Sequence, residues 1–168
     1  PAPTIDARDA TLDVDPRDGA IWILSGAAGE GGTTRVFRVS PDGMTVTEPT
    51  VSGEAPPARA YAKSVAHDGA LLLVGGSSTS GTRDDVWSLD LDALSWRRVA
   101  TLPSGRSHTA VRVVGDALWV IGGYDGDGPT EDALAVDLAS GAVRALPLSG
   151  DAPASIGTYQ GAVPFGGG

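Results

Sequence analysis

Cysteine is absent from this chain of 168 residues. Its absence excludes a disulfide scaffold and any metal site that needs a thiolate ligand. Histidine is almost as scarce, with only His67 and His108. We expect His67 to lie in a tight turn and the two imidazoles to fall on opposite sides of one structural unit. The sequence therefore offers no histidine pair for a catalytic centre.

Lysine is also rare, because Lys63 is the single lysine among 12 basic residues, against 21 acidic ones. The formal net charge of −9 repels phosphate backbones, so a nucleic acid is not an expected partner. Long apolar runs are missing as well. None approaches the roughly 18 residues that a membrane-spanning helix needs.

Methionine occurs once, at Met44, and the sequence begins at Pro1. We therefore expect a processed chain or a piece of a longer one, with residues 1–9 as a linker or cleavage remnant. The bias toward Ala, Gly, Asp and Arg is typical of a bacterium of high genomic GC content. A processed chain without cysteine favours an extracellular or cell-surface location, with the cytoplasm as the alternative.

Turn-forming residues are abundant, with 24 Gly and 12 Pro. Between them lie short apolar runs with the alternation of β-strands, such as the two that meet at His67-Asp68-Gly69. Hydrophobic residues make up 41% of the chain, which suffices for a globular core. The predicted fold class is all-β.

The apolar runs form an internal repeat. Offsets of 50 and then 47 residues superpose three runs that end in glycine, and the same offsets bring positions together in a third and a fourth predicted strand. One register through four separate strands is not expected by chance, so the chain is a repeat array. The superposed segments are residues 21–26, 71–76 and 118–123 in the second strand, Val36-Phe37, Val86-Trp87 and Ala133-Leu134 in the third, and Val46, Trp96 and Val143 in the fourth.

Each repeat is predicted to be a four-stranded antiparallel meander. The first covers residues 10–50, the second 60–103 and the third 107–149. Residues 155–168 are predicted to hold the first strand of a further unit.

The repeats resemble the kelch repeats of β-propellers. The second unit carries the family pattern best, with the glycine pair Gly75-Gly76, an aromatic residue at Trp87 and a tryptophan at Trp96. The third unit keeps Gly122-Gly123, and the first is degenerate. The resemblance implies a kelch-type β-propeller segment of four-stranded antiparallel blades. Because such propellers close with more than three blades, further blades from the same or another chain are expected partners.

A binding surface is expected at one rim of the blades. There, the loops at residues 29–35, 77–85 and 124–132 should lie beside the connections at 53–59, 104–108 and 150–157. Arg59 and Arg106 occupy equivalent positions, and the resemblance implies that such arginines often face an acidic ligand. Local ion pairs or hydrogen bonds to the loops are the alternative. The candidate ligand-binding residues of this rim are Arg59, Tyr61, Arg83, Arg106, His108 and Tyr124.

The loop at residues 124–132 is rich in carboxylates, which are the oxygen ligands that calcium prefers. Its spacing lacks the EF-hand series, so an ordinary solvated turn is the competing interpretation. The weak calcium candidates are Asp125, Asp127, Glu131 and Asp132.

No catalytic residue and no cofactor is predicted. Galactose-oxidase-like enzymes share the propeller fold, but their copper site needs a cysteine-linked tyrosine that this chain cannot supply. We expect a non-catalytic binding or assembly module for protein partners, part of a larger bacterial surface or secreted protein. The alternative is a carbohydrate-binding or carbohydrate-active propeller whose catalytic residues lie elsewhere. That alternative would require the exposed rings of Tyr61 and Tyr124 to bind a glycan.

Overall fold

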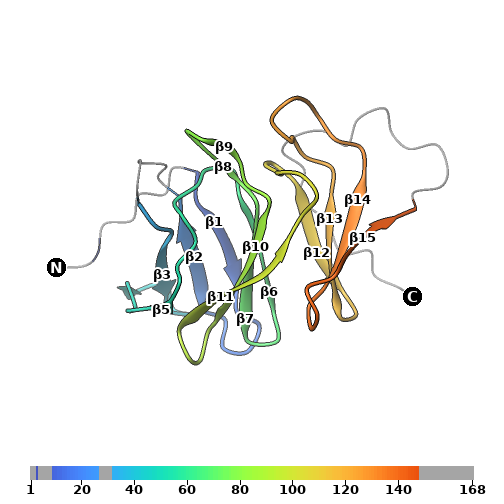
Figure 1. Cartoon of the computed structure of the whole chain (residues 1–168). Helices are drawn as coiled ribbons and strands as arrows, with labels where there is room; N and C mark the ends of the chain where they lie inside the picture. The colour runs from blue at the N-terminus through green and yellow to red at the C-terminus, as the bar shows by residue number, and fades with distance from the viewer. Residues whose placement is uncertain (1–2, 4–8, 27–31, 148–168) are drawn as a thin grey trace.

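A computed structural model describes residue 3 and residues 9–26 and 32–147 of the chain (Figure 1). Every regular element of this part is a β-strand, and none of it is a helix that could cross a membrane. The strands form three main sheets that stand side by side, together with one small hairpin. The predicted fold class, an all-β segment of four-stranded antiparallel blades, is confirmed.

The first and third sheets are simple meanders, in which each strand pairs antiparallel with the next one along the chain. Two apolar alternating runs joined by a short turn dictate each hairpin. The first sheet contains β1 (Thr11–Val14), β2 (Ile21–Ser25), β3 (Arg35–Val39) and β4 (Val46–Thr47), and the third contains β12 (Ala110–Val114), β13 (Ala117–Ile121), β14 (Ala133–Asp137) and β15 (Val143–Leu146).

The second sheet has a fifth strand that the sequence did not predict. The connection from the first sheet adds β5 (Ser52–Gly53) parallel to the outer edge of the meander. A β-carbon on Gly53 would lie 2.5 Å from the carbonyl oxygen of Trp96, so glycine permits this close approach. The meander contains β6 (Lys63–His67), β7 (Ala70–Val74), β10 (Asp85–Asp90) and β11 (Ser95–Thr101), and the loop after β7 forms the hairpin of β8 (Ser77–Ser78) and β9 (Gly81–Thr82).

The strand pairing reproduces the repeat register from the second strand onward. Leu24 pairs with Val36 in the first sheet, and the residues 50 positions later, Val74 and Val86, pair in the second. Ile121 and Ala133, a further 47 positions along, pair in the third.

The first strand departs from this register, because the turn between β1 and β2 is longer than the turn between β6 and β7. Val14 pairs with Ile21, whereas Ala66 pairs with Leu71, so the offset is 52 residues in this strand. An alignment of Asp9 with Arg59, which the uniform offset of 50 suggests, is therefore wrong. Asp9 corresponds to Tyr61.

Two apolar cores fill the spaces between the sheets. The core between the first and second sheets contains Trp22, Trp87 and Trp96, all buried. The core between the second and third sheets contains only aliphatic side chains, among them Leu72 and Val120. Both tryptophans of the second kelch-like unit thus act in sheet packing.

The first glycine of the second sheet's pair, Gly75, lies where the second and third sheets meet. A β-carbon on Gly75 would overlap the carbonyl oxygen of Arg106, and one on Gly76 or Gly123 would lie within 2.8 Å of a carbonyl oxygen of its own sheet. Gly75, Gly76, Gly122 and Gly123 all have positive φ. Gly75, Gly76 and Gly123 therefore combine close backbone approach with a left-handed conformation.

The three four-stranded meanders fall inside the ranges predicted for three blades, but β5 of the second sheet lies outside them, and the limits of those ranges stay predictions. The further strand predicted at residues 155–168 and most of the linker at residues 1–9 lie outside the described residues.

Candidate binding rim

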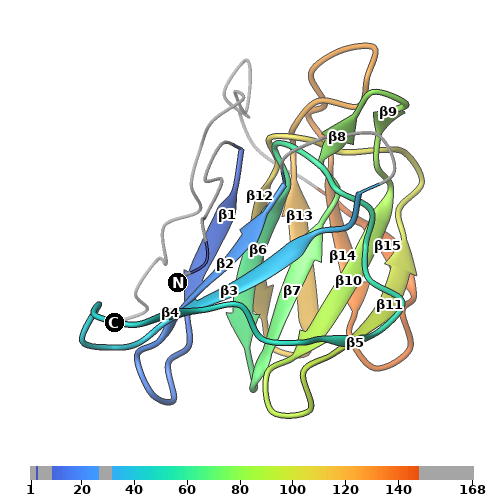
Figure 2. The ribbon, with the colours of Figure 1, turned by 90° about the vertical axis from the view of Figure 1, so that its left-hand side faces the viewer.

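The predicted loops and connections meet at one end of the sheets, which we call the loop rim (Figure 2). Its described parts are residues 32–35, 56–59, 77–85, 104–108 and 124–132, whereas Gly53, the start of the first predicted connection, lies in β5 beside the turn between β10 and β11. Hydrogen bonds join them directly, because the Thr82 Oγ1 donates to the Asp125 carbonyl oxygen at 2.6 Å, and Ser107 N donates to the Tyr124 carbonyl oxygen at 2.9 Å. Residues 27–31 and 150–157 lie outside the described part of the chain.

Arg59 lies beneath the loop rim with only 1% of its surface exposed. Its guanidinium donates to both carboxylate oxygens of Asp85, the Nη2 bond being 3.0 Å long, and to the carbonyl oxygens of Pro57 and Gly75 at 2.9 and 3.0 Å. Burial raises the pKa of Asp85, but the hydrogen bond and charge of Arg59 outweigh it, so the pKa lies below its usual value. Of the two roles that the sequence left open, the structure shows the local ion pair.

Arg106 repeats this arrangement in the third sheet. Its Nη2 donates to Asp132 Oδ2 at 2.6 Å, across the same 26 residues of sequence. The Nη1 atom of Arg106 is buried and has no hydrogen-bond partner among the described residues. Both arginines therefore join the start of a sheet to the start of its third strand, below the surface that a partner would touch.

Tyr61 and His108 form the most prominent side-chain pair of the loop rim. Their ring centroids lie 4.3 Å apart with an interplanar angle of 21°, so the rings stack. Backbone contact supports the stack, because His108 N donates to the Tyr61 carbonyl oxygen at 3.0 Å. Tyr61 remains 42% exposed.

The stack rests on an unusual backbone conformation. Tyr61 and His108 have φ angles of 57° and 55°, and the equivalent Asp9 of the first sheet has 57°. Residues other than glycine rarely adopt this region, at a cost of order 1–3 kcal/mol each. Three successive sheets therefore hold the same position in the same strained conformation and present three different side chains there.

His108 is a neutral partner in the stack near neutral pH. Burial lowers the pKa of its imidazole, the positive charge of Lys63 lowers it further, and the negative charge of Asp9 opposes both. The Nδ1 atom lies 3.2 Å from the Ser107 hydroxyl. The pair is therefore an aromatic contact surface rather than a cation on a ring.

The other predicted rim residues do not join this pair. Tyr124 is partly exposed, and its hydroxyl donates to the Gly126 carbonyl oxygen within its own loop at 2.9 Å. Arg83 donates from Nη2 to the Ser80 hydroxyl at 3.2 Å, again within one loop. Both residues shape the loops, while Tyr61 and His108 connect two sheets.

The carboxylates considered for calcium are not gathered around one point. Asp125 Oδ1 accepts hydrogen bonds from the backbone N–H groups of Asp127 and Gly128 at 2.9 and 3.0 Å, and Asp132 pairs with Arg106. Across residues 9–26 and 32–147, no three His, Cys, Asp or Glu residues form a group that could hold a metal ion. The backbone hydrogen bonds from Gly128 and Asp127 lower the pKa of Asp125, as in an ordinary carboxylate-capped turn.

Sequence reasoning missed two contributors to this surface, Asp9 and Lys63. Asp9 was hidden by the longer turn of the first sheet, which shifts the repeat offset. Lys63 was noticed only as the single lysine, although it lies two residues after Tyr61 and its charge acts on His108. The spacing of two residues from Arg59 to Tyr61 and from Arg106 to His108 was the signal that could have identified the equivalent positions.

Comparison with known proteins gives the same architecture. Residues 10–166 match the KLHDC2/KLHL20/DRC7 kelch-repeats domain. The chain is 33% identical to the leucine-zipper-like transcriptional regulator 1 homolog of Drosophila melanogaster over 116 residues, which is 62% of this chain and 12% of that protein. It is 27% identical to the multiple epidermal growth factor-like domains protein 8 of Homo sapiens over 85% of this chain and 6% of that protein.

A third similar protein is an F-box/kelch-repeat protein of Arabidopsis thaliana, 33% identical over 48% of this chain and 18% of that protein. The chain thus spans less than a fifth of the length of each of these relatives. All three relatives are eukaryotic, so they give no support to the bacterial origin that composition favoured.

Proposed function

This chain belongs to the kelch-repeat family, and from that premise we propose that it is a non-catalytic module that binds other proteins through its loop rim. Kelch-repeat domains are in general protein-interaction modules. The proposal assigns the contact to the Tyr61–His108 stack and the loops around it.

The stack is the observation that carries this assignment. An exposed tyrosine fixed against a neutral histidine supplies a large, rigid contact area that loses little conformational entropy when a partner binds. Strained φ angles at two equivalent positions are tolerated where the surrounding structure holds them, and such positions cluster at functional sites. A surface of this kind supports protein recognition.

The buried arginine pairs support the same proposal from below. Arg59 and Arg106 tie the strand starts to carbonyl and carboxylate groups of the loops, so the rim is held in place before a partner arrives. Preorganisation of this kind lowers the entropic cost of association. The arginines then act as positioning residues rather than as ligand contacts.

A photocrosslinking amino acid introduced at Tyr61 tests the proposal, with Met44 as the control site. Met44 is 85% exposed but lies in the turn between β3 and β4, away from the loop rim. The protein crosslinked through position 61 and not through position 44 is then purified for affinity measurements. We expect Tyr61→Ala and His108→Ala each to weaken its binding about tenfold or more, as central aromatic contacts do.

The carbohydrate alternative is decided by a glycan array with the unmodified chain and the variants Tyr61→Ala and Tyr124→Ala. A glycan whose binding disappears in both Tyr61→Ala and Tyr124→Ala would favour that alternative and contradict the protein proposal. The extracellular or cell-surface location, with the cytoplasm as its alternative, and membership of a larger bacterial surface protein remain predictions from composition. Localisation of the tagged full-length protein tests them.

A further inference from the structure

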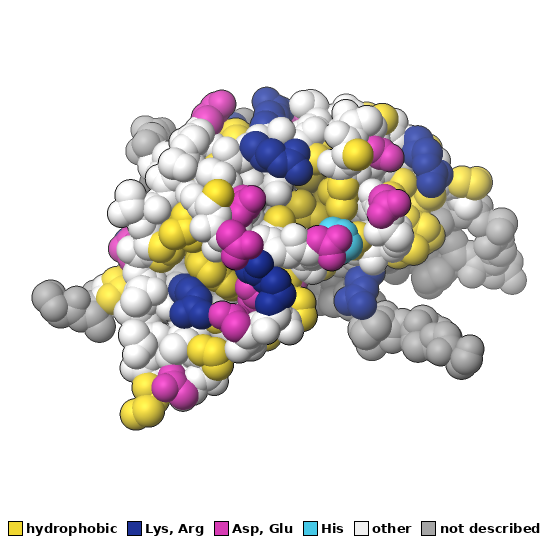
Figure 3. Space-filling model, turned by 90° about the horizontal axis from the view of Figure 1, so that it is seen from below, with side chains coloured by type: hydrophobic (Ala, Val, Ile, Leu, Met, Phe, Trp, Pro, Cys, Tyr) yellow, Lys and Arg dark blue, Asp and Glu magenta, His cyan; other side chains and the backbone are white. Residues whose placement is uncertain are grey.

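A pocket of about 330 Å³ opens between the second and third sheets at the end opposite the loop rim. We call this end the turn rim, because it carries the tight hairpin turns. Viewed from below, apolar side chains line a hollow there, with a histidine and acidic side chains beside it (Figure 3). The lining residues are His67, Asp68, Ala70, Leu72, Ser88, Arg97, Asp116, Leu138 and Ala139.

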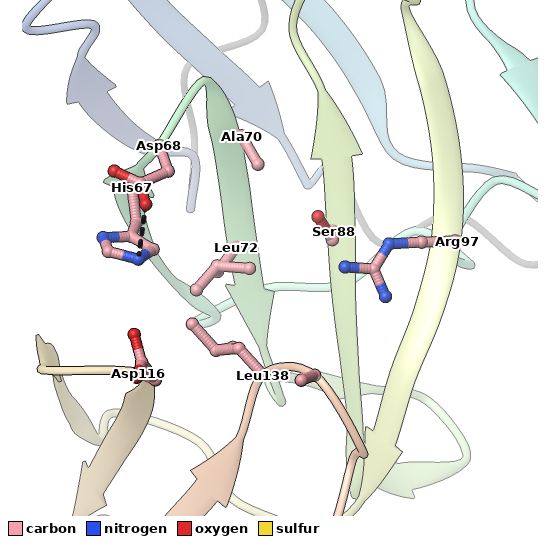
Figure 4. A pocket seen from close by; sticks show the side chains of 9 residues that line it. His67, Asp68, Ala70, Leu72, Ser88, Arg97, Asp116 and Leu138 are labelled. Carbon is pink, nitrogen blue, oxygen red and sulfur yellow. Dashed lines mark ion pairs between the residues drawn. The ribbon is translucent and has the colours of Figure 1, made fainter.

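One wall of the pocket is a cross-strand row of the second sheet. Strand pairing places Leu72 opposite Ser88, and Ser88 opposite Arg97, so these three side chains point to the same face. Leu138, from the turn after β14, lies across from them in Figure 4. The row runs from the buried Leu72 outward to the exposed Arg97.

The equivalent space between the first and second sheets is filled. Trp22 occupies the position of Leu72 and pairs with Arg38, whose guanidinium carbon lies 5.9 Å from the centre of the indole. Arg17 closes the end of this space by reaching Asp92 of the second sheet at 3.0 Å. The indole and the two arginines thus occupy the volume that stays open in the next interface.

The third sheet again has a tryptophan in this position. Trp119 lies opposite Ala135, which lies opposite Arg144. Of the three described sheets, only the second has the smaller Leu72 where the others have an indole. The pocket is therefore a place where the repeat pattern would put an aromatic ring and this chain does not.

Some of the polar groups around the pocket are uncommitted, although His67 Nε2 lies 3.5 Å from Asp68 Oδ2 (Figure 4). Ser88 is only 3% exposed, yet its hydroxyl makes no hydrogen bond within the described residues. Arg97 and Asp116 likewise form no ion pair in that part of the chain, whereas Arg17, Arg59 and Arg106 all do. A buried hydroxyl facing a pocket and a guanidinium without an ion pair at its mouth are groups that a ligand can satisfy.

We propose that this pocket binds an aromatic side chain of a partner protein, with an acidic residue beside it that pairs with Arg97. The ring fills the space that Trp22 fills in the preceding interface, against Leu72 and Leu138. At the opposite end, Asp68 and Asp116 select a basic residue on the other side of the ring (Figure 4). The partner segment thus carries a basic residue, an aromatic residue and an acidic residue, in that order.

The volume and the charges favour a peptide segment over a free small molecule. About 330 Å³ is at the lower end of the size of ligand pockets, enough for one large side chain. The pocket opens on the surface, so the side chain can insert while the peptide backbone stays outside (Figure 3). The opposed charges at its two ends match residues on either side of an inserted ring.

Titration of the full chain with short capped peptides tests this proposal. Binding is monitored by the NMR signals of the leucine methyl groups. The probe is acetyl-Gly-Lys-Trp-Asp-Gly-amide, and the matched controls replace its Trp by Ala or its Asp by Asn. We expect saturable shifts at Leu72 and Leu138 with the probe, at least tenfold weaker binding without the indole, and several-fold weaker binding without the carboxylate.

Three variants of the protein locate the binding. Leu72→Trp supplies the missing indole from within and should weaken peptide binding at least tenfold, and Ser88→Arg, which copies Arg38, should do the same if Leu72→Trp fails to fold. Arg97→Ala should abolish the preference for Asp over Asn. Arg98→Ala is the control, because Arg98 pairs across the strand with Trp87, on the other face of the sheet, and should change nothing.

The proposal is overturned if the probe gives no saturable shifts, or if the correctly folded pocket-filling variants bind it as well as the unmodified chain. Tyr61→Ala separates the two sites. It should weaken the binding of partners to the loop rim and leave peptide binding at the turn rim unchanged. The two assignments can therefore fail independently of each other.

Discussion

The guanidinium of Arg59 donates to both carboxylate oxygens of Asp85 inside the second blade. Arg106 and Asp132 form the equivalent pair of the third blade, but the two differ in depth. The side chain of Asp85 is 10% exposed and that of Asp132 is 47% exposed. Water therefore screens the Arg106–Asp132 pair of the third blade, whereas the Arg59–Asp85 pair of the second blade is shielded from water.

Replacement of Asp85 by Ala should strongly destabilise the fold. The change leaves the buried charge of Arg59 without its partner, which costs about 3–5 kcal/mol in the free energy of unfolding. Asp132→Ala is the matched control and should cost only about 1–2 kcal/mol, because water reaches that site. Urea denaturation of both variants measures the difference, and equal losses would show that depth does not decide the strength of these pairs.

The contribution of Asp85 should depend on pH. Its pKa in the folded state lies below the unfolded value of 3.8, so the folded state binds the proton less readily than the unfolded state does. The stabilisation is therefore complete above the unfolded pKa and is lost as the pH falls through the folded pKa. We expect the gap in unfolding free energy between the unmodified chain and Asp85→Asn to be constant from pH 7 to about 5 and to shrink below about pH 4.

A gap that stays constant down to pH 3 would contradict this prediction. The comparison with Asp85→Asn is needed because other carboxyl groups also have lowered pKa values. Asp15, held by its hydrogen bond to Arg17, and Glu48, held by Arg35, contribute to acid sensitivity in both proteins. Their effects cancel in the difference.

Gly75 should tolerate alanine much less well than Gly115. The two glycines have nearly the same φ, 55° and 58°, but a β-carbon on Gly75 would overlap the carbonyl oxygen of Arg106, and one on Gly115 would meet nothing within 4 Å. Gly115→Ala should therefore cost only the left-handed backbone term of about 1–2 kcal/mol. Gly75→Ala should cost at least about 1–3 kcal/mol more, because the third blade must move.

Thermal unfolding followed by circular dichroism compares these two variants. A similar loss of stability in both variants would show that glycine is required at position 75 for its φ angle alone. A much larger loss in Gly75→Ala would place Gly75 at the contact between blades.

The fold was predictable because its signals repeat. Register is set by alternation, and one register recurs in three sheets, so the pairing of Val74 with Val86 could be inferred from runs of apolar residues and their turns. The short strand β5 was not predictable in this way. It lies outside the repeat and depends on the close approach of Gly53 to Trp96, which is a tertiary contact.

The candidate sites were only partly predictable. Tyr61 and His108 were singled out by their equivalent positions, but their stack and their φ angles follow from the angle between two sheets. The pocket at the turn rim was missed, although the superposed runs already placed Leu72 between Trp22 and Trp119. To predict the pocket, one must know which face of the sheet these residues occupy and which side chains lie opposite them. Sequence periodicity gives the face but not the opposing side chains.

The pocket itself should make Leu72→Trp a tolerated substitution. A tryptophan there copies Trp22 and Trp119, and the space beside Leu72 can receive the ring, so we expect a change in unfolding free energy within about 1 kcal/mol. Leu71→Trp is the matched control. Leu71 belongs to the closed core on the other face of the blade, where a larger side chain should cost about 1–3 kcal/mol or more. If Leu72→Trp is destabilised as much as Leu71→Trp, the space between the second and third blades cannot accommodate an aromatic ring, and the partner proposed for it must be of another kind.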